Sequence, residues 1–150
     1  MSSESAPPPA YENEAVLRVD TGPVAAPLLA RVVAMMLARA DCPIDKLDDA
    51  MLICDAIGAH APPHSVDGHI KFTISTSAAG LELRVGDLAS DGAQRLLQAA
   101  VLPGIGNVLE PIVDALRIEP SADERSEELV LELGFGPTLA YDKRTSAPRS

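Results

Sequence analysis

Two neighbouring segments, residues 69–76 and 81–86, alternate apolar and polar side chains at a period of two residues. Such alternation is typical of strands that bury one face, because successive side chains of a strand point to opposite sides. Residues 77–80 between them are few enough for a tight turn. The pattern therefore predicts a hairpin with one apolar face, made of Ile70, Phe72, Ile74, Leu81, Leu83 and Val85.

The rest of the chain supplies elements on both sides of this hairpin. Proline residues near the start of three segments favour helix first turns, and Pro62 and Pro63 end the second helix. The expected order is strand, helix, helix, two hairpin strands, two short helices and two strands, over residues 14–20, 23–40, 43–61, 69–76, 81–86, 90–102, 107–115, 116–119 and 128–135.

Apolar residues spread along both long segments at helical spacing. The first helix is expected to have a wide apolar surface, with Val24, Leu28, Met35 and Leu37 beside Arg31. The second helix is expected to bury a stripe formed by Ile44, Leu47, Met51, Cys54 and Ile57. Leu129, Leu131 and Leu133 share one face of the last strand. These patterns predict an α+β fold: a two-layer α/β sandwich with a mixed, mostly antiparallel sheet, covered on one face by helices.

The chain of 150 residues is long enough for one domain with a core of its own. That core is expected over residues 14–135. The Ser- and Pro-rich residues 1–13 and the weakly basic residues 136–150 are expected to be disordered tails.

The formal net charge is −10, which disfavours binding to nucleic acid and to anionic membranes. It favours a partner with a basic face, or it serves solubility alone. Aromatic residues make up only 3% of the chain, which counts against stacking platforms for bases.

Two cysteines, Cys42 and Cys54, bracket part of the second helix. If one helix joins them, they lie roughly 18 Å apart, too far for a disulfide. Free thiols suit a reducing compartment, and the first residues lack the basic and apolar regions of a signal peptide. The apolar stretch 24–40 is interrupted by Pro27, Arg31 and Arg39. We therefore expect a cytoplasmic protein.

The segment Leu-Asp-Asp-Ala-Met-Leu-Ile-Cys-Asp-Ala, residues 47–56, resembles a helix of the bacterial anti-sigma-factor serine kinases. These kinases belong to the ATP-binding superfamily of histidine kinases, gyrase and heat-shock chaperones, whose domain is called the Bergerat fold. Residues 113–118 resemble the helix-to-strand junction near the end of those kinases. The expected element order is also similar to theirs over nearly the whole core.

In that family a Glu on this helix acts as a base, and an Asn one turn later holds Mg²⁺. The resemblance places Ala56 and His60 at these two positions. An alanine cannot accept a proton, and a histidine is a poor ligand for a hard cation. Asp55 lies one residue earlier, about 100° around an ideal helix, and is not expected to substitute.

Two further family motifs are partly present. Asp87 stands where an Asp accepts the adenine amino group, but only Gly92 remains of the glycines that should follow it. Gly104 and Gly106 resemble a Gly-x-Gly phosphate loop, with Arg95 as the one basic residue nearby. Each motif also has a plain structural interpretation: Asp87 as a strand-end turn residue and Asn107 as an N-cap.

The resemblance thus implies a non-catalytic regulator, a pseudo-kinase that binds a protein partner, either a sigma factor or an anti-sigma antagonist. It implies no metal and no firm cofactor. The alternative is an active ATP-binding serine kinase with unusual motif residues. In the family the first helices and the sheet edge meet the partner, so residues 24–40 are expected to take part, and a homodimer stays open.

Other constellations are weaker. His60, His64 and His69 with Cys54 make an incomplete zinc set, interrupted by Pro62 and Pro63. Cys54 also lies on the apolar stripe, where a cysteine is most often a small core residue rather than a nucleophile.

Overall fold

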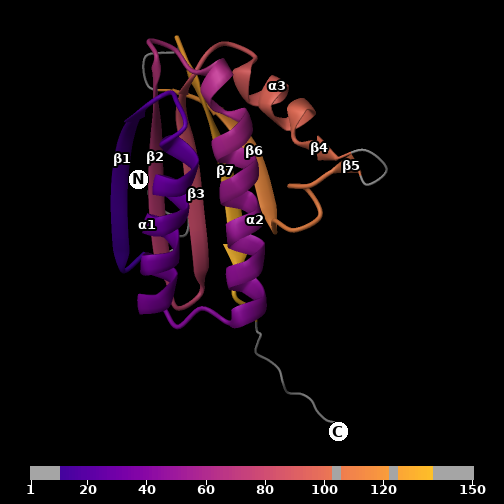
Figure 1. Cartoon of the computed structure of the whole chain (residues 1–150). Coiled ribbons are helices and arrows are strands. Elements are labelled where there is room, and N and C mark those ends of the chain that lie inside the picture. The colour runs from indigo at the N-terminus through magenta and orange to yellow at the C-terminus, as the bar shows by residue number, and fades with distance from the viewer. Residues whose placement is uncertain (1–10, 103–105, 122–124, 137–150) are drawn as a thin grey trace, which may run out of the picture.

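A computed structural model describes residues 11–102, 106–121 and 125–136 of the chain. A sheet carries helices on one face, with α1 and α2 side by side in front of it and α3 beyond them (Figure 1). The elements are β1 (Asn13–Asp20), α1 (Ala25–Arg39), α2 (Ile44–His60), a 3₁₀ turn (Pro62–His64), β2 (His69–Ser77), β3 (Gly80–Leu88), α3 (Gly92–Ala99), β4 (Val101–Leu102), β5 (Gly106–Asn107), β6 (Ala115–Pro120) and β7 (Glu127–Gly134).

The main sheet has five strands in the order β1-β2-β3-β7-β6, and every neighbouring pair is antiparallel. The α+β class predicted from the sequence is confirmed. The prediction of a mixed sheet included some parallel pairing, and these strand pairs contain none. The last strand along the chain, β7, lies antiparallel between β3 and β6. The expected tails lie almost wholly outside the described residues. Asn13 already belongs to β1, so the sheet begins one residue before the expected core.

The hairpin is confirmed, with Ala78 and Ala79 between its strands. Phe72 pairs with Val85 and Ile74 with Leu83, so one face is apolar along its length. All six apolar residues expected on that face are at most 4% exposed. Leu129, Leu131 and Leu133 of β7 continue the same buried face, as predicted.

The two long helices are present, but the sequence misjudged which residues they bury. Ile44 is 79% exposed, so its predicted burial is wrong, and Val24 and Met35, which were placed on the apolar surface of the first helix, are 60% and 59% exposed. The two helices pack closely on each other at one point, where a Cβ built on Gly58 would lie 2.3 Å from the Ala26 Cβ atom. The buried residues of the two helices are Ala25, Leu29, Val33, Met36, Leu37, Ala50, Ile53, Cys54, Ile57 and Gly58.

The second short helix, expected over residues 107–115, is not formed. Residues 106 and 107 instead pair with β4 as a two-stranded ribbon. A single turn follows, in which the backbone N–H groups of Ile112 and Val113 both donate to the Leu109 carbonyl. Pro111 lacks an N–H, and β6 begins at Ala115, so the turn has no room to become a helix.

The sheet face opposite the helices is polar and carries a network of ion pairs. Arg84 on β3 contacts Glu119 and Glu128, each at 3.0 Å. Arg117 on the edge strand contacts Glu119 and Glu132, both at 2.6 Å. Val130 pairs with both arginines in the strand register and is fully buried. The aliphatic parts of the two arginine side chains therefore cover this valine on an otherwise polar face.

Candidate functional site

An apolar pocket lies between α2 and the segment that connects α3 to β6. Its volume is about 440 Å³. We call it the α2 pocket. Its lining consists of Leu52, Asp55, Ala56, Ala59 and His60 from α2, and Ala100, Val101, Asn107, Val108, Pro111 and Ile112 from the connection.

Helical spacing explains the α2 wall of this pocket. The five lining residues follow one another at i, i+3, i+4, i+7 and i+8, which places them on one face of the helix. The opposite face of α2 carries the buried residues Ala50, Cys54 and Gly58. Since that face is fixed against the sheet and α1, the pocket-lining face is turned away from the core.

The expected base and metal positions, Ala56 and His60, both line this pocket. Asp55 lines it too, at the position one residue before Ala56. Adjacent helical residues differ by about 100°, but a broad pocket wall spans that arc. Asp55 is exposed and Ala56 is half-buried. The carboxylate therefore stands at the pocket rim.

Asn107 holds the opposite wall in place. Its Oδ1 atom accepts hydrogen bonds from the backbone N–H groups of Leu109 at 2.8 Å and Glu110 at 3.0 Å. Its Nδ2 atom donates to the Leu97 carbonyl at 2.9 Å. Leu109 is fully buried beneath the turn. The sequence-based interpretation of Asn107 as a cap is thus confirmed for a single turn, although no helix follows it.

Asp87 lies elsewhere, at the end of β3. Its Oδ2 atom is 3.1 Å from Nε2 of His69, and its φ of 60° puts the backbone in the left-handed region. Its backbone carbonyl accepts a hydrogen bond from the Val66 N–H group at 2.8 Å. Asp87 does not line the α2 pocket. These contacts fit a strand-end turn residue, since Asp tolerates the left-handed conformation better than most side chains.

The three glycines of the expected nucleotide site have separate roles. Gly92 opens α3, and a Cβ there would lie 3.0 Å from the His64 carbonyl oxygen, so its place is set by packing. Gly106 has a φ of +93° and open space around it. Gly104 lies outside the described residues. The structure thus brings Ala56 and His60 together beside Asn107, and leaves Asp87 and Gly92 apart from that pocket.

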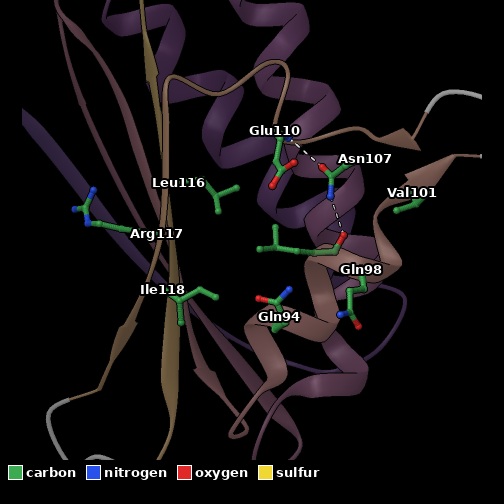
Figure 2. Close-up of a pocket in the computed structure, with 9 residues that line it drawn as sticks. Gln94, Gln98, Val101, Asn107, Glu110, Leu116, Arg117 and Ile118 are labelled. Carbon is green, nitrogen blue, oxygen red and sulfur yellow. Dashed lines mark hydrogen bonds between the residues drawn. The ribbon is translucent and has the colours of Figure 1, made fainter.

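A second pocket of about 490 Å³ lies on the other side of the β4–β5 ribbon, between α3 and β6. Figure 2 shows Leu116 and Ile118 of β6 pointing toward Gln94 of α3 across it, whereas Arg117 points to the opposite side of the strand. Arg117 there binds Glu119 and Glu132. This cavity is therefore lined by amide and apolar side chains with Glu110 at one end.

Neither thiol is arranged for nucleophilic chemistry. Burial, and to a lesser degree the charge of Asp55, raises the pKa of Cys54 to about 12. Both cysteines are free thiols. Among the residues that the structure describes, no three His, Cys, Asp or Glu side chains gather as a metal site would require.

Magnesium-bound ATP does not fit the residues of the α2 pocket. No lysine or arginine is among its described lining residues, so a polyphosphate would meet no permanently charged side chain of opposite sign there. Its one carboxylate, Asp55, would repel the phosphates unless a metal ion came between them. A methyl group and an imidazole stand where the resemblance requires a base and an oxygen ligand.

The sequence missed the apolar character of this pocket. Leu52 and Ala59 lie on the side of α2 that carries its acidic residues, away from the expected core stripe, and Val108 and Ile112 were assigned to a helix. The available signal was the i, i+4, i+7 spacing of Leu52, Ala56 and Ala59, which places small and apolar residues on one helical face.

The fold and the pockets define a class: an α+β protein whose antiparallel sheet carries three helices on one face, with an apolar pocket against the second helix. Neither the models of known protein families nor the curated protein sequences match this chain. The kinase resemblance therefore stays a prediction that rests on the residues quoted for it. No helix in the described part of the chain is both long and apolar enough to cross a membrane.

Proposed function

We propose that this protein is a non-catalytic cytoplasmic regulator that binds a protein partner. The partner class, a sigma factor or an anti-sigma antagonist, comes from the resemblance alone. The acidic surface and the apolar pocket support the more general part of the proposal, which is protein binding without phosphate transfer.

The observation that carries this proposal is the lining of the α2 pocket. Leu52 and Val101 are 56% and 47% exposed at its opposite walls, and Ala56 contributes a methyl group where a kinase needs a carboxylate. Apolar side chains exposed around a concave site are typical of protein interfaces and of sites for apolar ligands. Catalysis of phosphate transfer requires positioned cations and a base, and the described lining supplies no lysine or arginine.

One observation favours the alternative, an active serine kinase. Asp55 lines the same pocket as Ala56, so a carboxylate is available one residue from the expected base. A kinase reaction through Asp55 would still need Asp87 to hold adenine, and Asp87 instead contacts His69 outside the pocket. The non-catalytic proposal therefore accounts for more of the site.

The experiment is capture of partners from the native cell by the immobilised full chain, followed by reconstitution of the captured protein in purified form. We expect a defined complex with a measurable dissociation constant, and no transfer of γ-phosphate from ATP to that partner. Purified captured proteins that fail to bind would refute the regulator. Phosphate transfer that is lost in Asp55→Asn and in Asp87→Asn would establish the kinase instead.

A further inference from the structure

A line of exposed side chains runs along the outer side of α2 and ends at the α2 pocket. We call it the α2 ridge; its members follow at spacings of four, four, three and four residues, and they are Ile44, Asp48, Leu52, Asp55 and Ala59. All five are exposed, Ile44 to 79% and Leu52 to 56%. Apolar and acidic side chains thus alternate along one side of the helix.

The carboxylates of this ridge are available to a partner. Neither Asp48 nor Asp55 forms an ion pair within the described ranges of the chain. They are seven residues apart, which is about 10.5 Å along a helix axis. Leu52 lies between them and also belongs to the wall of the α2 pocket.

The pocket gives the ridge an apolar end. Leu52, Asp55 and Ala59 belong to both, and the facing wall holds Val101, Val108 and Ile112. In Figure 1 the β4–β5 ribbon and α3 flank α2 on the side away from α1. The ridge is therefore bounded on one side by a wall that can contact an inserted side chain.

The geometry points to a basic amphipathic helix of a partner protein as the occupant of the α2 ridge, a conclusion that rests on the regulator function proposed above. One apolar side chain of that helix enters the α2 pocket. Lysine or arginine residues spaced two turns apart meet Asp48 and Asp55. Helices that lie in grooves are recognised by anchors at this spacing, and the net charge of −10 speeds the encounter with a basic partner.

A second copy of this chain is a poorer occupant. Two such ridges in contact would bring four carboxylates together without a cation, and like charges at close range are repulsive. The same reasoning disfavours any acidic helix. Complementary charge thus selects the basic helix.

The test uses a synthetic helix-forming peptide of about 18 residues, in which a leucine lies between two lysines seven residues apart on the same helical face. A scrambled peptide of the same composition is its control. In amide chemical-shift mapping of the full chain, we expect the ordered peptide to perturb α2 and residues 107–112. The scrambled peptide should bind at least about tenfold more weakly.

Matched variants locate the surface. Leu52→Ala should weaken peptide binding about fivefold to tenfold, whereas Met35→Ala, at a side chain with similar exposure on α1, should change it less than about twofold.

Asp48→Asn with Asp55→Asn should weaken peptide binding about threefold to tenfold, because two surface charge pairs are lost. Asp20→Asn with Asp67→Asn removes the same charge from other exposed positions and should leave binding within about twofold.

Equal binding of the scrambled peptide, shifts confined to other surfaces, or equal losses in both double variants would overturn the α2 ridge as the docking surface. The proposed regulator function would still be supported after that outcome if the purified captured partner bound the protein. Failure of every captured partner to bind in purified form would instead refute the proposed regulator function. The two failures are therefore distinguishable.

Discussion

At the scale of single residues, the environment of each side chain decides its chemistry more than its type does. Cys54 is 1% exposed, whereas Cys42 is half-buried ahead of α2 and donates a weak hydrogen bond to the Pro43 carbonyl. Burial, followed by the charge of Asp45, also raises the pKa of the Cys42 thiol. Both thiols therefore stay protonated at neutral pH, and they differ in access.

We expect a thiol reagent to modify Cys42 in the native protein and to reach Cys54 only after unfolding. Cys42 should react more slowly than a free cysteine at pH 8, because its raised pKa leaves less thiolate. The measurement is the number of thiols modified with and without denaturant. Cys42→Ser should abolish the native reaction, and labelling of Cys54 in the folded protein would contradict the assigned burial.

A second prediction at this scale concerns Glu119. Hydrogen bonds from Arg117 and then from Arg84 hold the pKa of Glu119 below its usual value. A lowered pKa in the folded state contributes stability above the unfolded-state pKa, and this contribution is lost as the pH falls through the folded-state pKa. The side chain is 36% exposed, so solvent screening limits the gain.

Glu119→Gln should lower the free energy of unfolding at pH 7 by about 0.5–1 kcal/mol. The difference from the unaltered protein should shrink as the pH falls below the unfolded-state pKa of about 4.3 and through the lowered folded-state pKa. Urea unfolding at several pH values measures it. Glu12→Gln is the control, because Glu12 is exposed on the chain before β1. A difference that persists undiminished in acid would count against the ion-pair network.

At the scale of elements, α1 and α2 depend on one close contact. A Cβ added at Gly58 would lie 2.3 Å from the Cβ and 2.5 Å from the Cα of Ala26. The two helix backbones approach here because both residues are small. Glycine is otherwise unfavourable inside a helix, so its presence in the last turns of α2 is explained by this packing.

Gly58→Ala should destabilise the protein by about 1–2 kcal/mol, because the overlap outweighs the better helix propensity of alanine. Gly22→Ala, which has nothing within 4 Å of the added Cβ, should change stability by less than about 0.5 kcal/mol. Thermal unfolding of the two variants provides the comparison. Equal stability of Gly58→Ala and the unaltered protein would mean that the helices do not pack as closely as described.

At the scale of elements it is also clear which features of the fold could be predicted from the sequence. The hairpin followed from period-two alternation, because residues adjacent in sequence determine both its strands and its turn. The burial of α1 did not follow, since Ala25 is buried and Met35 is exposed although both are apolar, and the packing of α1 on α2 and on the sheet decides between them. Residues 107–115 do not form the expected helix because Asn107 pairs with Val101 and β6 begins at Ala115, which leaves space for a single turn.

At the scale of the whole molecule, the site is assembled from parts far apart in sequence. The α2 pocket joins residues 52–60 to residues 100–112, and no periodicity within either segment indicates that they meet. The sequence did single out Ala56, His60 and Asn107, which the fold brings to one pocket. It did not predict that Asp87 would lie outside that pocket, because the path of the chain after β3 decides this.

The layered arrangement gives each surface a separate character. One face of the sheet carries the ion pairs of Arg84 and Arg117, and the other face is covered by helices. The exposed apolar and acidic groups of the α2 ridge therefore stand out as the surface for a partner. The central claim is that the pocket beside this ridge accepts an apolar side chain rather than a nucleotide.

Isothermal titration of the full chain with magnesium-bound ATP tests this claim most directly. We predict no saturable heat of binding up to about 1 mM nucleotide, because the described pocket lining offers no lysine or arginine to the phosphates. A micromolar isotherm that disappears in Asp87→Ala would contradict the account and establish a nucleotide site.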